Sequence, residues 1–250
     1  MAILSSQDVT IGNSNFVTTA VAQYDLGTRG YTRDGRAFRY VLNGATLAVT
    51  GDVMQSPAIA AGNLARAVNT TSLVAQFATA ITLTCGSSVA SGFYNDGYLC
   101  VASGAGQGFV YQIKSHPAVS TGATGVFTLY DEDGLAVAIT ITSTVSLLAS
   151  KYNGVIQMPV TTPTGTVAGV ACYPIAVTQY GWLQTWGPAA CNGGDTGVIG
   201  TPQLAIGSTA GRITSATAAS LISGAGQLVG YLMQAGILSQ YVMIDLRIAP

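Results

Sequence analysis

The chain has 250 residues, of which 49% are hydrophobic and 8% are charged, and its formal net charge at pH 7 is −1. An ordinary soluble domain has roughly 25% charged residues, and a protein that stays monomeric in solution usually has more net charge than this. Apolar and β-branched residues run through the whole chain, which excludes a disordered protein. The length suits one large all-β domain or two to three small ones.

Long flexible charged side chains are scarcer still. Glu132 is the only glutamate, and Lys114 and Lys151 are the only lysines. These residue types are depleted in the buried centres of protein interfaces. The composition therefore predicts an assembly protein, much of whose surface is covered by other proteins.

Targeting and membrane signals are weak. The longest apolar stretch, 221–243, is broken by several glycines and glutamines, so we expect no membrane-spanning helix. The first eight residues lack the basic start and apolar run of a signal peptide. The four cysteines form no CxxC pair, which argues against a zinc site. We expect four free buried thiols in a chain that folds in a reducing cytoplasm, and one disulfide, such as Cys172 to Cys191, stays open.

Taken in chain order, short β-branched or aromatic runs end repeatedly at Gly, Asn, Asp or Pro, which predicts strands joined by tight turns. Helical patterns are few and are broken by glycine. The fold class we predict is therefore all-β, a β-sandwich or β-barrel. The predicted strands are 38–42, 97–102, 108–114, 125–130, 180–186, 227–234 and 240–248.

The chain divides into three predicted parts. Residues 1–37 are polar and turn-rich, as expected of an extended N-terminal arm. Residues 38–77 and 155–250 would form the core β domain, and 78–154 a β-rich inserted domain.

Four of the nine basic residues fall within eleven positions, namely Arg29, Arg33, Arg36 and Arg39. Three interpretations stay open. The cluster is a solvated arm or hairpin, or it docks onto an acidic protein surface through bidentate Arg–carboxylate pairs, or it binds nucleic acid. The last is disfavoured because the chain is not basic overall.

Trp182 and Trp186 lie with Tyr180 at even spacing in one predicted strand, so we expect their side chains on one face. They form either the aromatic core of the β domain or an exposed anchor for a partner.

No pattern points to an enzyme. The sequence contains no GxSxG, HExxH or GxxxxGK[ST] motif. His116 is the only histidine, and it is interpreted as a surface or loop residue with no orienting partner nearby. The glycine-rich segment 103–108 lies between two predicted strands and indicates a hairpin turn. The acidic segment 131–133 indicates a solvated hairpin tip, with a weak metal site as the alternative. We therefore predict no catalytic residues, no metal and no cofactor.

Three stretches, in this order, resemble a family of tailed-phage capsid decoration (cement) proteins. They are 35–45 (GRAFRYVLNGA), 108–116 (GFVYQIKSH), and 152–155 (YNGV) followed by 180–190 (YGWLQTWGPAA). The resemblance implies a β-rich virion structural protein of a bacteriophage, located on the capsid surface. Its partner would be the major capsid protein, and it would be a homo-oligomer, often a trimer, with no nucleic acid or membrane bound. The resemblance carries over no defined site residues, and the segment before Arg29 matches none of it.

The function predicted is stabilisation of the expanded icosahedral head by protein–protein contacts. Two alternatives remain at this point. The chain is a tail-tube or head or tail fibre component, or it is a glycan-binding host-attachment module that uses Trp182 and Trp186.

Overall fold

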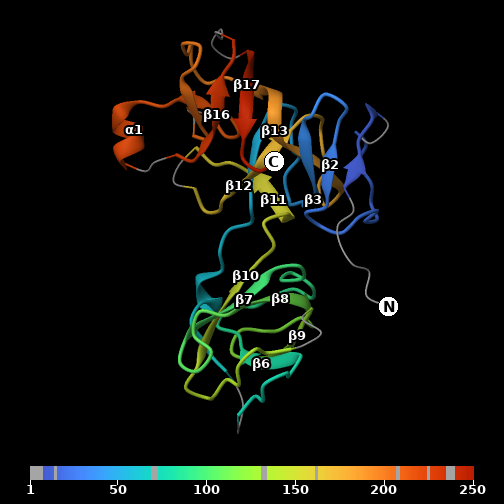
Figure 1. Ribbon diagram of the computed structural model, residues 1–250, viewed down its shortest axis with the longest axis vertical. Coiled ribbons are helices and arrows are strands. Elements are labelled where there is room, and N and C mark those ends of the chain that lie inside the picture. The colour runs from blue at the N-terminus through green and yellow to red at the C-terminus, as the bar shows by residue number, and fades with distance from the viewer. Residues whose placement is uncertain are drawn as a thin grey trace. The chain divides into compact units, whose positions relative to one another are not determined.

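The computed structural model describes residues 8–13, 16–68, 73–130, 134–160, 163–206, 209–223, 226–234 and 240–250. The chain forms two compact units (Figure 1). Unit 1 consists of Met1–Pro57 and Gly154–Pro250, and unit 2 of Ala58–Asn153. Nearly all the regular structure is β, which confirms the predicted fold class.

Unit 1 contains one sheet of eleven strands among the described residues, in the order β1-β2-β3-β11-β4-β12-β13-β17-β16-β14-β15. Because β3 also pairs with β13, the strands β3, β11, β4, β12 and β13 close into a ring. The strands are β1 (Val9–Thr10), β2 (Arg29–Tyr31), β3 (Ala37–Asn43), β4 (Val53–Gln55), β11 (Asn153–Gln157), β12 (Val167–Ala171), β13 (Tyr180–Asn192), β14 (Pro202–Leu204), β15 (Thr214–Ser215), β16 (Leu228–Leu232) and β17 (Tyr241–Arg247), with one short helix, α1 (Ala218–Ser223).

Strand β13 belongs to two parts of this sheet. Its first half pairs with β3, and its second half, from Trp186 to Asn192, pairs with β17. The sequence predicts that the strand ends before Gly187–Pro188, but β13 continues through both residues. Pro188 is exposed and pairs with Asp245 of β17. Proline is tolerated in a strand where no neighbour needs its missing N–H.

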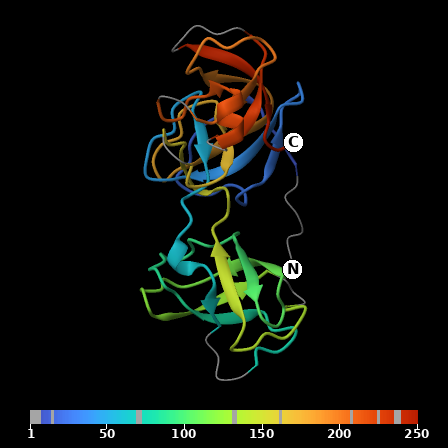
Figure 2. The same cartoon turned by 90° about the vertical axis from the view of Figure 1, so that its left-hand side faces the viewer.

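Unit 2 has a sheet of six strands among the described residues, in the order β5-β10-β7-β8-β9-β6. An isolated bridge between Val68 and Leu83 joins the two ends of this order, and the sheet curves round on itself (Figure 2). The strands are β5 (Arg66–Ala67), β6 (Ala80–Thr84), β7 (Tyr98–Ser103), β8 (Val110–Ser115), β9 (Thr124–Leu129) and β10 (Thr144–Leu148).

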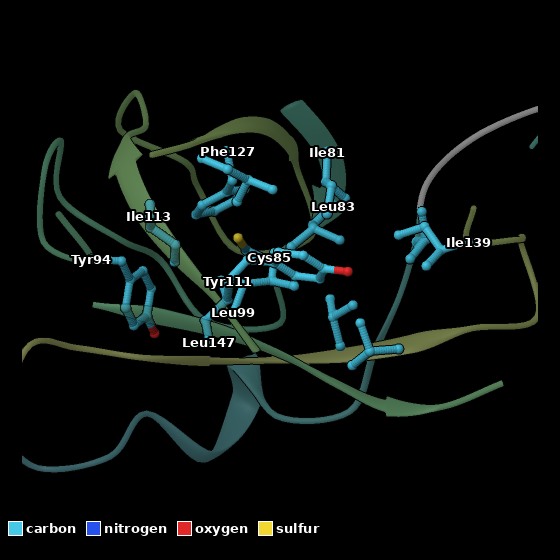
Figure 3. Close-up of a cluster of buried hydrophobic side chains, with 14 of the residues drawn as sticks. Ile81, Leu83, Cys85, Tyr94, Leu99, Tyr111, Ile113, Phe127, Ile139 and Leu147 are labelled. Carbon is cyan, nitrogen blue, oxygen red and sulfur yellow. The ribbon is translucent and has the colours of Figure 1, made fainter. Parts of the chain in front are cut away.

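The core of unit 2 comes from the inward residues of its strands. Each strand alternates buried and more exposed positions, as in the exposed–buried–exposed pattern of β8. Figure 3 shows Ile81, Leu83, Leu99, Ile113 and Phe127 gathered in this centre. The glycine-rich turn 103–108 joins β7 to β8 as an antiparallel hairpin, as predicted. Its glycines at 104, 106 and 108 have positive φ, which non-glycine residues rarely adopt.

The observed division differs from the predicted one at two places. Unit 2 begins at Ala58, whereas the sequence predicts an insertion from residue 78. The reason is that β5 pairs with β10 and its neighbour Val68 with Leu83, so both belong to the second sheet. The segment predicted as an extended arm belongs to unit 1, where β2 pairs with β3 and Ile11 is buried beside Trp182.

Candidate protein-interaction face

The register of unit 1 brings part of the arginine cluster and one tryptophan onto the same face. Tyr31 of β2 pairs with Ala37 of β3, Ala37 pairs with Trp186 of β13, and Trp186 pairs with Arg247 of β17. Residues paired across neighbouring strands point to the same side of a sheet. Arg29 and Arg39 form the adjacent cross-strand pair of β2 and β3 on that side. We call Arg29, Tyr31, Arg39, Trp186 and Arg247 the basic–aromatic row.

Trp182 and Trp186 point to opposite faces, contrary to the expectation from their even spacing. Trp182 pairs with Tyr40, whereas Trp186 pairs with Ala37, because the register between β13 and β3 shifts after Gln184. This shift is a β-bulge in which one extra residue, Thr185, reverses the alternation. The single-face prediction therefore fails at the bulge.

Gln184 supports this bulge from a buried position. Its Nε2 donates to the carbonyl oxygens of Pro188 at 2.8 Å and Trp186 at 3.0 Å, and its Oε1 accepts from the thiol of Cys172 at 3.1 Å. Gln184 thus satisfies two backbone acceptors next to the bulge, while the carbonyl oxygen of Thr185 accepts from the N–H groups of Ile248 and Ala249.

Trp182 belongs to the core of unit 1. It is 2% exposed, and its ring contacts Tyr40 edge to face at 5.0 Å and Tyr24 at 5.3 Å between centroids. Ile11 and Phe16 from the N-terminal segment cover the same aromatic cluster. Of the two interpretations, Trp182 is core and offers no surface to a ligand, while Trp186 is half-exposed.

Arg29 and Arg39 lie directly opposite each other on neighbouring strands. The guanidinium of Arg29 stacks on Tyr31 at 4.2 Å from the ring centroid. Arg39 donates from Nη1 to the carbonyl oxygen of Gly27 and from Nη2 to the backbone oxygen of Pro250, both at 3.1 Å. Among the described residues, no Asp or Glu side chain forms an ion pair with either arginine. The Nε atoms of both are shielded from water and have no acceptor in the described part of the chain.

The other two arginines of the cluster lie in and beside the turn between β2 and β3. Arg36 forms an ion pair with Asp34 at 2.9 Å, and Arg33 is exposed. A hydrogen bond from Thr32, together with Arg36, holds the pKa of Asp34 below its ordinary value. An open concavity of about 470 Å³ at this turn is lined by Ile11, Asn13, Thr32, Arg33, Asp34 and Arg36.

The row continues into an apolar surface on β13, β17 and β16. Alternate residues of β17 are exposed, with Tyr241 at 56% and Met243 at 44%, while Val242, Ile244 and Leu246 between them are buried. Ala190 pairs with Met243, and Asp245 lies between Pro188 and Tyr231. We call the apolar face the outward side chains of Pro188, Ala190, Tyr231, Met233, Tyr241 and Met243. Figure 1 shows these three strands together, coloured orange to red.

Sequence reasoning missed Arg247 and the apolar face. Arg247 pairs with Asp245 at 3.0 Å and lies over the ring of Tyr231 at 5.2 Å. The alternation Tyr241, Met243, Asp245, Arg247 against three aliphatic residues is visible in the sequence. It identifies an outward side of this strand, but not its neighbours.

His116 lies in a loop after β8, one of the two places predicted for it, but it is buried and not on the surface. Its Nε2 accepts the backbone N–H of Tyr94 at 2.9 Å, so Nδ1 carries the proton and donates to the Pro117 carbonyl oxygen at 2.8 Å. Burial lowers the pKa of this imidazole, and the bond to Pro117 partly opposes that shift. With both nitrogens bonded to backbone, the ring holds a loop of unit 2 in place.

The four cysteines are free thiols. Cys85 and Cys191 are buried, while Cys100 and Cys172 are half-buried, which differs from the expectation that all four are buried. Burial raises the pKa of Cys172 to about 11 and that of Cys191 further. These two residues, the pair left open as a disulfide, are therefore poorly reactive as thiolates at neutral pH.

In the described part of the chain, no group of three or more His, Cys, Asp or Glu side chains could hold a metal ion. No helix there is long and apolar enough to cross a membrane. The acidic segment 131–133 lies outside the described residues.

Comparisons with known proteins give no family assignment. No protein-family model, no curated protein and no solved structure matches this chain. The resemblance to capsid decoration proteins therefore stays a prediction.

Proposed function

We propose that this chain is a virion structural protein, a capsid decoration protein that binds the major capsid protein on the outside of a phage head. It acts as a homo-oligomer and by binding alone, without catalysis. The observation that carries the proposal is the apolar face beside the basic–aromatic row. Two tyrosines and two methionines are exposed there, three of them on β16 and β17 and Met233 directly after β16, next to a tryptophan and arginines. These residue types are enriched in protein interfaces.

The physical mechanism is linkage between binding and the state of the shell. A ligand that binds only the expanded lattice shifts the equilibrium towards that lattice. Many copies with modest individual affinity stabilise the shell by repetition. Rigid strands suit this role, because little conformational entropy is lost when they bind.

The test is co-sedimentation of the purified chain with heads of the phage that encodes it, in the unexpanded and the expanded form. We expect saturable binding to the expanded form only, and a higher melting temperature of the decorated heads. Absence of binding to either form contradicts the proposal. Assembly of the chain alone into tubes or fibres would favour a tail or fibre component instead.

A pair of variants locates the binding surface. Met243→Glu puts a charge in the centre of the apolar face, and we expect it to weaken head binding by about tenfold or more, since an interface core tolerates unpaired charge poorly. The matched control is Val21→Glu, at a residue that is 76% exposed in the N-terminal segment. Equal binding by both variants would show that the apolar face makes no contact with the head.

A further inference from the structure

We propose that Arg29 and Arg39 form a carboxylate-binding site through which the basic–aromatic row receives an acidic segment of a protein partner. The inference rests on the proposed function and deepens it, because it states the chemistry that the capsid surface presents at this row.

The basic–aromatic row places two positive charges, those of Arg29 and Arg39, next to each other. Like charges directly opposite each other on neighbouring strands destabilise a sheet, yet Arg29 and Arg39 occupy such a pair. The basic–aromatic row and the apolar face together contain three arginines, and Asp245 of β17 is already paired with Arg247. In the described part of the chain, no Asp or Glu side chain pairs with Arg29 or Arg39, and Arg39 Nη2 bonds the backbone oxygen of Pro250. A carboxylate from another molecule would turn this repulsion into two favourable ion pairs.

The guanidinium groups of Arg29 and Arg39 are held in fixed planes before any partner binds. Stacking on Tyr31 fixes the plane of the Arg29 guanidinium, and hydrogen bonds to the backbone oxygens of Gly27 and Pro250 fix that of Arg39. A guanidinium that is held flat offers parallel N–H donors that match a carboxylate in a bidentate geometry. Both Nε atoms are already shielded from water, so part of the cost of desolvating these cations has been met during folding.

The residues that surround Arg29 and Arg39 favour a peptide over a nucleic acid as the partner. Trp186 and Arg247 continue the row, and the apolar face lies beyond them. An acidic segment that also has apolar side chains would contact both surfaces. A phosphate backbone would gain little from the apolar face, and the chain lacks the basic excess of nucleic-acid-binding proteins.

The experiment titrates the full chain with a synthetic peptide of alternating Glu and Ser at about 0.15 M salt, and follows the emission of Trp186 and the heat of binding. Peptides of alternating Gln and Ser and of alternating Lys and Ser, and a thymidine oligonucleotide, are titrated in parallel. Trp186→Phe identifies the fluorescence signal, because Trp182 is buried away from the row. We expect saturable binding of the acidic peptide only.

The variant series separates the site from general charge. Arg29→Gln with Arg39→Gln should weaken binding by about tenfold or more, because charged hydrogen bonds are lost. Arg33→Gln with Lys114→Gln changes the net charge equally at exposed positions and should leave affinity within about twofold. If the first variant unfolds, Arg29→Gln alone takes its place, since the Arg29 side chain makes no hydrogen bond to the described backbone. Lysine at both positions keeps the charge but lacks the planar guanidinium fork. The affinity of this variant should lie between that of wild type and that of the Arg29→Gln, Arg39→Gln variant.

Equal losses in both double variants, tighter binding of the oligonucleotide, or no binding of the acidic peptide would overturn the inference. Failure of the proposed function is distinguishable. If the Arg29→Gln, Arg39→Gln chain still decorates heads at wild-type affinity, the function stands and this site is refuted. If wild type binds the acidic peptide but no head, the site stands as an acidic-protein site and the capsid role fails.

Discussion

At the residue scale, three asparagines that precede glycines hold loops through their side chains. Asn153 donates to the carbonyl oxygen of Phe93 at 3.0 Å, and Asn192 to Asp52 Oδ1 at 2.8 Å. Asn43 is 1% exposed and donates from Nδ2 to the carbonyl oxygens of Thr46 and Ile175, both at 2.8 Å. In the sequence such Asn–Gly pairs indicate only turns.

Asn43→Asp should destabilise unit 1 by about 3–5 kcal/mol at pH 7, because a buried carboxylate would then face carbonyl oxygens without a counter-ion. Asn43→Ala should cost less, about 1–3 kcal/mol, since it only leaves acceptors unpaired. Urea denaturation of both variants measures the difference. At acid pH the Asp variant should recover part of its loss as the carboxyl becomes protonated. A smaller loss for Asp than for Ala at pH 7 would contradict the donor role of this amide.

His116 makes the stability of unit 2 depend on pH. Its pKa is lowered in the folded chain by burial, whereas it is about 6.5 when unfolded. The unfolded state therefore binds the proton more readily, and the free energy of unfolding falls as pH drops below about 6.5. His116→Gln should remove this pH-dependent contribution. Between about pH 7 and pH 5, the free energy of unfolding of the variant should therefore fall by less than that of wild type. Parallel pH profiles for the two proteins would contradict the explanation.

At the element scale, the bulge in β13 decides which side chains unit 1 presents. It turns Trp186 to the face opposite Trp182 and joins the barrel part of the strand to the part that carries the apolar face. Gln184 satisfies the carbonyl oxygens of Trp186 and Pro188 next to the bulge, and the backbone N–H groups of Ile248 and Ala249 satisfy that of Thr185.

Gln184→Leu keeps the volume but leaves the carbonyl oxygens of Trp186 and Pro188 without this donor. We expect a loss of about 2–4 kcal/mol in the free energy of unfolding, with a shifted emission of Trp186. The control is Gln112→Leu, at an exposed position on β8, where a surface change should stay within about 0.5 kcal/mol. Guanidinium denaturation measures both variants. Tryptophan fluorescence follows the unfolding of Gln184→Leu, and circular dichroism follows that of Gln112→Leu. Equal effects of both substitutions would show that the bulge does not depend on this amide.

At the scale of the whole molecule, unit 2 is an insertion between two paired strands. Gln55 of β4 pairs with Ile156 of β11, so the chain leaves and re-enters unit 1 at adjacent points. Antiparallel neighbours of this kind can be joined by a two-residue hairpin. Unit 2 has its own core, closed by the bridge between Val68 and Leu83.

Replacing 58–153 with an Asn-Gly turn should therefore leave unit 1 folded, and the excised segment 58–153 should fold by itself. Each piece should show a cooperative thermal transition. The control is the same Asn-Gly replacement of 163–206, which removes β12, β13 and β14 and should unfold unit 1. An excised segment that stays unfolded would show that the two units depend on each other for stability.

The sequence by itself determined the all-β class, the approximate positions of seven strands (β3, β7, β8, β9, β13, β16 and β17) and the glycine hairpin between β7 and β8, because turn residues and alternation are local signals. Only the tertiary structure decided that β5 belongs to unit 2, that Arg247 pairs with Trp186 across β17 and β13, and that Trp182 and Trp186 point to opposite faces. Strand partners lie far apart in the chain, and one extra residue at a bulge reverses every later side chain. The physical reason is that the alternation of residues along a strand defines its two faces. Which face is buried, and beside which residues, depends on the strands with which it pairs.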